Sequence, residues 1–346
     1  MKHLITTIIL FLLLATPVCA VEFEAPEVPI SGQEYMPKDT QSFAAGLWSI
    51  MKESISHVKP SIHDAAGICL SIVSSVILCS IVKVFPGNSG KMVTLVGTIL
   101  IGYLLLNPSN ALIHLGSKTV QELSDYGKLL LPVLTAAMAA SGGITRSAAL
   151  YTGAVAFNTL LCSFISSIIV PLIYVFLCVA VASGAIGEIA LEKAKNFIKW
   201  LITWGLKIVL YVFSGFMGIT GVISGSADAA AIKATKLTIS GVVPVVGGIL
   251  SDASETVLVS AGIVKNSVGV YGLLAIIAVW IGPFIKIAVQ HLLLRLTCVI
   301  CEVFSAERTC KLIQDFASAM GLLLAMTGTV CLLLLISIVC FMKGVA

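Results

Sequence analysis

The chain has 346 residues, of which 58% are hydrophobic and only 11% charged, and its formal net charge is +4. A soluble domain carries roughly 25% charged residues, so these proportions exclude a soluble enzyme and predict an integral membrane protein. No run of lysine and arginine of the nucleic-acid-binding kind is present, which excludes nucleic acid as a partner. Lipid is therefore expected to be the main solvent of the chain.

Residues 1–20 are predicted to be a cleavable secretory signal peptide. Lys2 and His3 precede the apolar run Leu4–Leu14, and small residues lead up to a cleavage point after Ala20. The apolar run is too short to cross a bilayer comfortably. We expect an exported N-terminus without a lipid anchor.

Residues 21–64 are predicted to be an extracytoplasmic leader followed by an amphipathic helix. The part 21–40 is acidic and rich in proline. In 41–59 apolar residues recur every three or four positions, which is typical of a helix with one apolar face. That face is expected to pack on the protein's own helices, on the membrane or on a partner.

The rest of the chain predicts an all-α polytopic fold of about seven spans and two short segments broken by proline and glycine. Lys83 and Lys91 place the loop after the first span in the cytosol by the positive-inside rule. The region 107–128 is interpreted as a mixed polar and amphipathic linker. In chain order the apolar segments are Gly67–Val84, Met92–Leu106, Leu129–Gly143 (short), Ala148–Pro171, Leu172–Gly187, Leu201–Gly225, Leu237–Leu250 (short), Val257–Pro283, Phe284–Val303 and Ala317–Met342.

Two pairs of prolines suggest an internal repeat. Pro132 and Pro244 are 112 residues apart, and so are Pro171 and Pro283. The chain is therefore divided into a membrane hairpin and linker at 65–128, a first membrane repeat at 129–236 and a second at 237–346.

The two broken segments, at Pro132 and Pro244, are candidates for a conduction site. Pro244 removes a helical hydrogen bond, and Gly247 and Gly248 then free the backbone. Unpaired backbone groups persist at membrane depth only where protein or a water-filled cavity surrounds them. The alternative is a kinked or re-entrant helix with a purely structural role.

Ionisable residues near the second break are further candidates, because such groups at membrane depth are costly and mark function by default. Asp252 or Glu255 could pair with Lys265, which is followed by Asn266. The alternative places Lys265 at an interfacial turn with its ammonium group among the lipid headgroups. Arg146 is expected to be a similar topology anchor or part of the same site.

Close helix packing is expected along 201–225, where glycines recur and the last two form a G-x-x-x-G pair. These glycines are Gly215, Gly218, Gly221 and Gly225. No catalytic motif and no metal-ligand spacing is found, and Cys298 and Cys301 form an isolated C-x-x-C without a second pair. Neither a catalytic site nor a cofactor is expected.

The segments Ile239–Gly248, Ser251–Thr256 and Lys265–Val270 closely resemble the stage III sporulation protein AE family of endospore-forming Firmicutes. The resemblance covers roughly residues 40–345, and the chain departs from the family in lacking a proline between Glu302 and Ala306. Supporting matches are Ala148–Tyr151, Pro171–Ile173, Gly225–Asp228 and Glu307-Arg308.

The resemblance implies a membrane subunit of the channel-like assembly that joins mother cell and forespore, located in the mother-cell-derived outer forespore membrane. It implies as partners the other stage III sporulation A proteins, including an ATPase and ring-forming subunits, and indirectly stage II sporulation protein Q. The leading hypothesis is a substrate-conducting or export-gate subunit. The alternatives are a non-conducting scaffold for that complex and a stand-alone secondary transporter.

Overall fold

The structure of the protein is a computed structural model that describes residues 25–37, 42–84, 90–242, 247–304 and 307–343. Within these ranges, the side chains of 83–84, 90–91, 221–242, 247–261 and 264 are not described. Pro244 and the signal peptide at 1–20 fall outside the described residues.

The described residues fold into helices, and none of them lies in a β-strand. Six of the helical segments are long and apolar enough to cross a membrane. This confirms an all-α membrane fold. The elements are α2 (Ile30–Gln33), α3 (Phe43–Ser56), α4 (Val58–Val84), α5 (Gly90–Ala140), α6 (Ile144–Phe164), the π-helical turn η1 (Ile165–Ile169), α7 (Val170–Ile186), α8 (Ile189–Val242), α9 (Gly247–Glu302) and α10 (Glu307–Met342).

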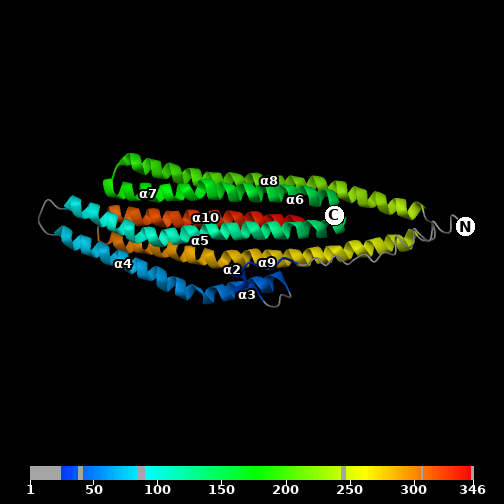
Figure 1. Ribbon diagram of the computed structural model, residues 1–346, viewed down its shortest axis with the longest axis horizontal. Coiled ribbons are helices and arrows are strands. Elements are labelled where there is room, and N and C mark those ends of the chain that lie inside the picture. The colour runs from blue at the N-terminus through cyan, green and yellow to red at the C-terminus, as the bar shows by residue number, and fades with distance from the viewer. Residues whose placement is uncertain (1–24, 38–41, 85–89, 243–246, 305–306, 344–346) are drawn as a thin grey trace.

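The long helices lie side by side in an elongated bundle (Figure 1). Helix α10 is central, with α6, α7 and α8 on one side of it and α4 and α9 on the other. The last residues of α4, α7 and α9 and the first residues of α5, α8 and α10 lie at one end of the bundle, and the turn between α5 and α6 lies toward the other. Helices α8 and α9 extend beyond the rest, whereas α3 and α2 lie across α9. The predicted amphipathic helix at 41–59 is thus present as α3.

Pro132 does not break its helix, in contrast to the prediction. Helix α5 runs for 51 residues, about 77 Å at 1.5 Å per residue. Pro132 is exposed, while the adjacent Leu131 and Leu134 are buried against the core. Packing of that apolar face holds the helix together across the hydrogen bond that proline cannot make. The chain turns instead at Ser141–Gly143, where Gly142 adopts a φ of 94° that favours glycine.

Other segments predicted as separate spans are also joined. The segments around Pro171 form one helical run from Ile144 to Ile186, and η1 ends two residues before the proline. A widened π turn accommodates the ring that would clash with a regular preceding turn. Pro283 lies inside the continuous helix α9. The described residues therefore contain 6 candidate spans, fewer than the roughly seven that the sequence predicts. The internal repeat stays a prediction.

Gly127 allows close contact between α5 and α10, which a methyl group would disturb. A Cβ atom at Gly127 would lie 2.6 Å from Leu334 Cδ2. We expect Gly127→Ala to lower the free energy of unfolding by about 1–3 kcal/mol, the usual cost of overpacking. Thermal unfolding of the purified chain in detergent measures this.

Gly215→Ala is the matched control, because no neighbouring atom lies within 4 Å of a Cβ at Gly215. We expect it to be neutral or to stabilise by up to about 1 kcal/mol through helix propensity. Equal stability of the Gly127 variant and wild type would contradict the close contact. The packing role predicted for Gly215 and Gly218 is not fulfilled inside this chain, since neither has such a neighbour. Close packing at Gly221 and Gly225 stays a prediction, because their surroundings lie outside the described residues.

Candidate functional site

A row of exposed polar side chains runs along one face of α5. The spacing of three and four residues places them on one side of the helix. From first to last they cover about 32 Å of helix, close to the ~30 Å thickness of the hydrocarbon core of a bilayer. We call this row the polar stripe. It consists of Asn107, Asn110, His114, Lys118, Gln121, Asp125 and Lys128.

The helices that pack on α5 are apolar. On the face of α5 opposite the polar stripe, Gly116 lies against Leu323 and Met326 of α10, and Gly127 lies against Leu334. Helix α10 has no charged residue between Asp315 and Lys343. Beside the stripe, α6, η1 and α7 have no charged residue between positions 146 and 188. The stripe therefore lies beside helix segments that are built for lipid or for a protein core.

These contacts fix the depth of the stripe if α10 crosses the bilayer. About 20 helical residues span the hydrocarbon core, and the charge-free part of α10 runs from Phe316 to Met342. Every placement of the core within that part includes 323–335. Because Gly116 and Gly127 lie against this range, the middle of the polar stripe falls at membrane depth in each placement.

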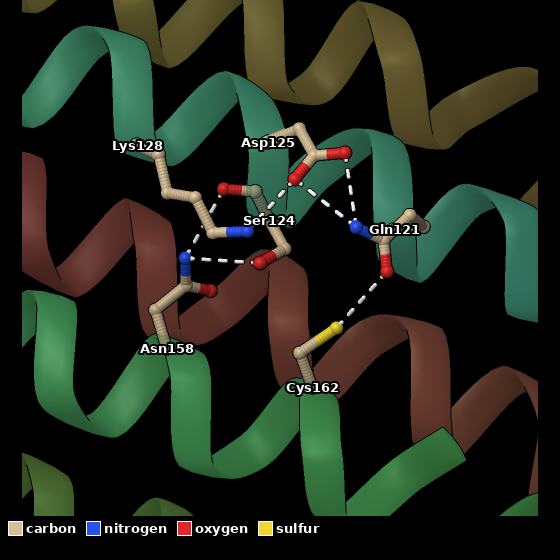
Figure 2. Close-up of polar contacts among 6 residues, drawn as sticks. All are labelled: Gln121, Ser124, Asp125, Lys128, Asn158 and Cys162. Atoms are coloured by element: carbon tan, nitrogen blue, oxygen red, sulfur yellow. Dashed lines mark hydrogen bonds and ion pairs between the residues drawn. The ribbon is translucent and has the colours of Figure 1, made fainter.

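The polar groups at the centre of the stripe satisfy one another (Figure 2). Gln121 Nε2 donates to both carboxylate oxygens of Asp125 at 3.0 Å, and Lys128 Nζ lies 2.8 Å from Asp125 Oδ1. From α6, Cys162 donates its thiol hydrogen to Gln121 Oε1 at 3.4 Å. The result is a connected network that links α5 to α6.

Buried polar contacts beneath and beside this network strengthen the same junction. Asn158 of α6 donates to the hydroxyl and to the backbone carbonyl of Ser124, both at 3.2 Å. Farther along α5, Lys118 Nζ lies 3.5 Å from Glu122 Oε1. The Ser31 hydroxyl of α2 donates a hydrogen bond to Glu122 Oε2 at 2.6 Å. The stripe thus holds two cations balanced by two adjacent carboxylates.

A groove of about 430 Å³ opens beside the stripe where α5 meets α6 and η1. The π turn η1 begins at the edge of this groove. Such turns inside α-helices occur frequently at functional sites. The polar lining comes from both helices and consists of His114, Ser117, Lys118, Gln121, Cys162 and Ser166.

Two residues singled out in the sequence come together elsewhere. Arg146 and Lys265 are only 7% and 4% exposed, and their charges are close enough to interact. Arg146 Nη2 donates to the Cys340 carbonyl at 3.4 Å. The burial of Lys265 does not fit a lysine whose ammonium group reaches the lipid headgroups, and that of Arg146 does not fit an exposed anchor. Both lie away from the stripe, since Arg146 precedes Asn158 by about 18 Å along α6.

The remaining residues that the sequence predicts for the site do not belong to the polar stripe. Asn266 is exposed and lines a separate groove with Ser42 and Tyr271. Gly247, Gly248, Asp252 and Glu255 lie in α9, but their side-chain surroundings are not described, so a pairing of either carboxylate with Lys265 stays a prediction. Among the described residues, no group of three or more His, Cys, Asp or Glu side chains could hold a metal ion.

Comparison with known proteins agrees with the resemblance seen in the sequence. The family model described as Stage III sporulation protein AE matches residues 36–344. The chain belongs to this family. It is 24% identical over 184 residues to Stage III sporulation protein AE of Bacillus subtilis (strain 168), and the match covers 53% of this chain and 46% of that protein. The matched part is thus about half of the relative's length. No solved structure matches the chain.

Membership of the stage III sporulation protein AE family gives the chain a role in sporulation, and its six apolar helical segments give it a place in a membrane. The polar stripe was not singled out from the sequence, where 107–128 was interpreted as a linker. The sequence does contain a signal for the stripe, because the polar residues of 107–128 recur at helical spacing between two apolar segments. That spacing alone does not say which side of the helix faces the core.

Proposed function

We propose that the protein is a substrate-conducting or export-gate subunit of the stage III sporulation transport complex, and that the polar stripe of α5 lines the conducted path. The sporulation role follows from family membership. The observation that carries conduction is an exposed stripe with two lysines and an aspartate at the depth of apolar helices.

Lipid cannot be the environment of such a stripe. A single ionisable side chain in the hydrocarbon core already costs at least about 2.5–3.5 kcal/mol, and such residues almost always face a bundle interior or a water-filled cavity. One lysine on an otherwise apolar face, such as Lys207 on α8, can reach the headgroups with its long side chain. Gln121 and Asp125 are too short to do so from mid-depth. The stripe therefore needs water or protein in front of it.

The assembly around this subunit is part of the proposal. Its partners would be the other stage III sporulation A proteins, with the ATPase among them as the energy source, and it would connect indirectly to stage II sporulation protein Q. The proposed location is the outer forespore membrane.

A scaffold that conducts nothing is the second candidate, and one observation favours it. The Gln121–Asp125–Lys128 network is satisfied within the chain, so it could lie against a polar surface of another subunit without any water between them. The two functions differ in whether bulk water reaches the stripe.

Thiol labelling decides between them. In a variant without native cysteines, Gln121→Cys and Asn110→Cys should react with a membrane-impermeant maleimide in sporulating cells. Leu160→Cys is the matched control, because Leu160 is 55% exposed on α6 near the same depth but apolar, and it should stay unlabelled. Unreactive thiols at both stripe positions, in a chain inserted at normal levels, would rule out a water-filled path and favour the scaffold.

A further inference from the structure

The polar stripe faces away from the core of its own chain. The opposite side of α5 is formed by Leu105, Ile113, Leu123 and Leu134, each at most 1% exposed and packed in the main hydrophobic core. The stripe and its 430 Å³ groove therefore lie on the outside of the bundle. One copy of the chain supplies a wall for a path at this face but does not enclose it.

We propose that the wall is completed by the same face of further copies of this chain, so that the path runs between copies. This inference rests on the proposed function, which requires water in front of the stripe. Copies inserted in one membrane share their orientation, so a symmetry axis along the membrane normal would bring stripe residues of equal depth to face one another.

The charges on the stripe are compatible with an identical neighbour, because each lysine that would face its counterpart across the axis is paired within its own chain. Lys118 is paired with Glu122, and Lys128 with Asp125, so the face carries no excess charge that would repel a second copy. Around an axis, the stripe residues would form a ring from Lys118, an acidic level from Asp125, and a second ring from Lys128. Rings of charged side chains are a recurrent way to line a selective pore.

The polar face is wide enough to be the wall of a shared path, because it continues onto α6. Exposed hydroxyl side chains there recur at helical spacing, at Thr152, Thr159, Ser163 and Ser166. By contrast, α8 presents exposed Trp200, Trp204, Ile208 and Tyr211, which suit lipid contact. The α5–α6 face is thus the side that needs protein and water rather than lipid.

Cross-linking within the membrane tests this arrangement. Gln121→Cys and Asn110→Cys would each be made as a single variant in the full-length chain without native cysteines. Two differently tagged copies of each variant would be expressed together in sporulating cells and treated with a bifunctional maleimide of about 10 Å span. We expect a product of twice the monomer mass that carries both tags. Trp204→Cys on α8 is the control and should give no such product. A double variant, Asn110→Cys with Ser166→Cys, should extend the dimer to a ladder of higher oligomers.

The failures of the two proposals can be told apart. If the stripe thiols react with the impermeant maleimide but give no product with both tags, the path is not shared between copies, and conduction stands. Products that contain only another protein would also overturn the pairing of copies. If the thiols neither react nor cross-link in a normally inserted chain, the water-filled path itself is refuted.

Discussion

Asp315→Ala should lower the free energy of unfolding by about 3–5 kcal/mol, as expected when one partner of a buried ion pair is removed. Lys195 Nζ lies 2.6 Å from Asp315 Oδ2, and the two side chains are only 9% and 14% exposed. The pair joins α8 to α10, and Lys199 donates to Ser318 one turn farther along. Without the carboxylate, a buried ammonium group keeps its desolvation cost and loses its compensation.

Chemical unfolding of the purified chain in detergent measures this effect. The double variant Lys195→Met with Asp315→Leu should recover most of the loss, because replacing both charges with apolar groups of similar volume is often neutral or stabilising. Lys193→Ala changes an exposed neighbour on α8 and should stay within about 0.5 kcal/mol of wild type. A double variant no more stable than Asp315→Ala would contradict the role of the pair.

The pairing of Lys195 with Asp315 could not be predicted from the sequence. Lys195 and Asp315 are 120 residues apart, and each lies in a charged stretch that looks like an ordinary surface linker. Their burial depends on how α8 packs against α10. The burial of Arg146 and Lys265 within reach of each other's charge is of the same kind, since it depends on how α6 packs near α9.

Most of the helices could be predicted from the sequence. The rule that proline ends a helix fails at two positions. Apolar composition and spacing correctly indicated an all-α membrane fold and the helix at 43–56. Pro132 does not break its helix and Pro283 does not separate two spans, because tertiary packing on both sides of each proline outweighs the loss of one hydrogen bond. Segments read as separate spans consequently joined into helices of more than 50 residues.

The polar stripe lies in the region 107–128, for which the sequence predicts a mixed polar and amphipathic linker. Its seven residues recur at helical spacing, which is a signal for one polar face. The sequence does not show that a charge-free segment of α6 lies beside this face, or that α10 packs on the opposite face of α5. These contacts, made at Asn158 of α6 and at Gly116 and Gly127 of α5, turn a polar helix into a candidate path at membrane depth.

Asp125→Leu should reduce the yield of heat-resistant spores by about tenfold or more, at normal protein levels. The carboxylate accepts hydrogen bonds from Gln121 and pairs with Lys128, so leucine removes the acceptor of both groups and adds an apolar obstacle to the proposed path. An added barrier of about 1.4 kcal/mol is enough for a tenfold loss of flux. Spore counts after heat treatment, together with immunoblots of the membrane fraction, measure the effect.

Two matched variants make the result specific to the stripe. Asp125→Asn keeps the shape and an acceptor for Gln121 but loses the charge, so its spore yield should fall between those of wild type and Asp125→Leu. Leu160→Ile changes an exposed apolar residue of α6 near the same depth and should sporulate normally. If Asp125→Leu sporulates as well as Leu160→Ile at equal membrane levels, the stripe does not line the conducted path. Its network then serves to hold α5 against α6, as a scaffold requires.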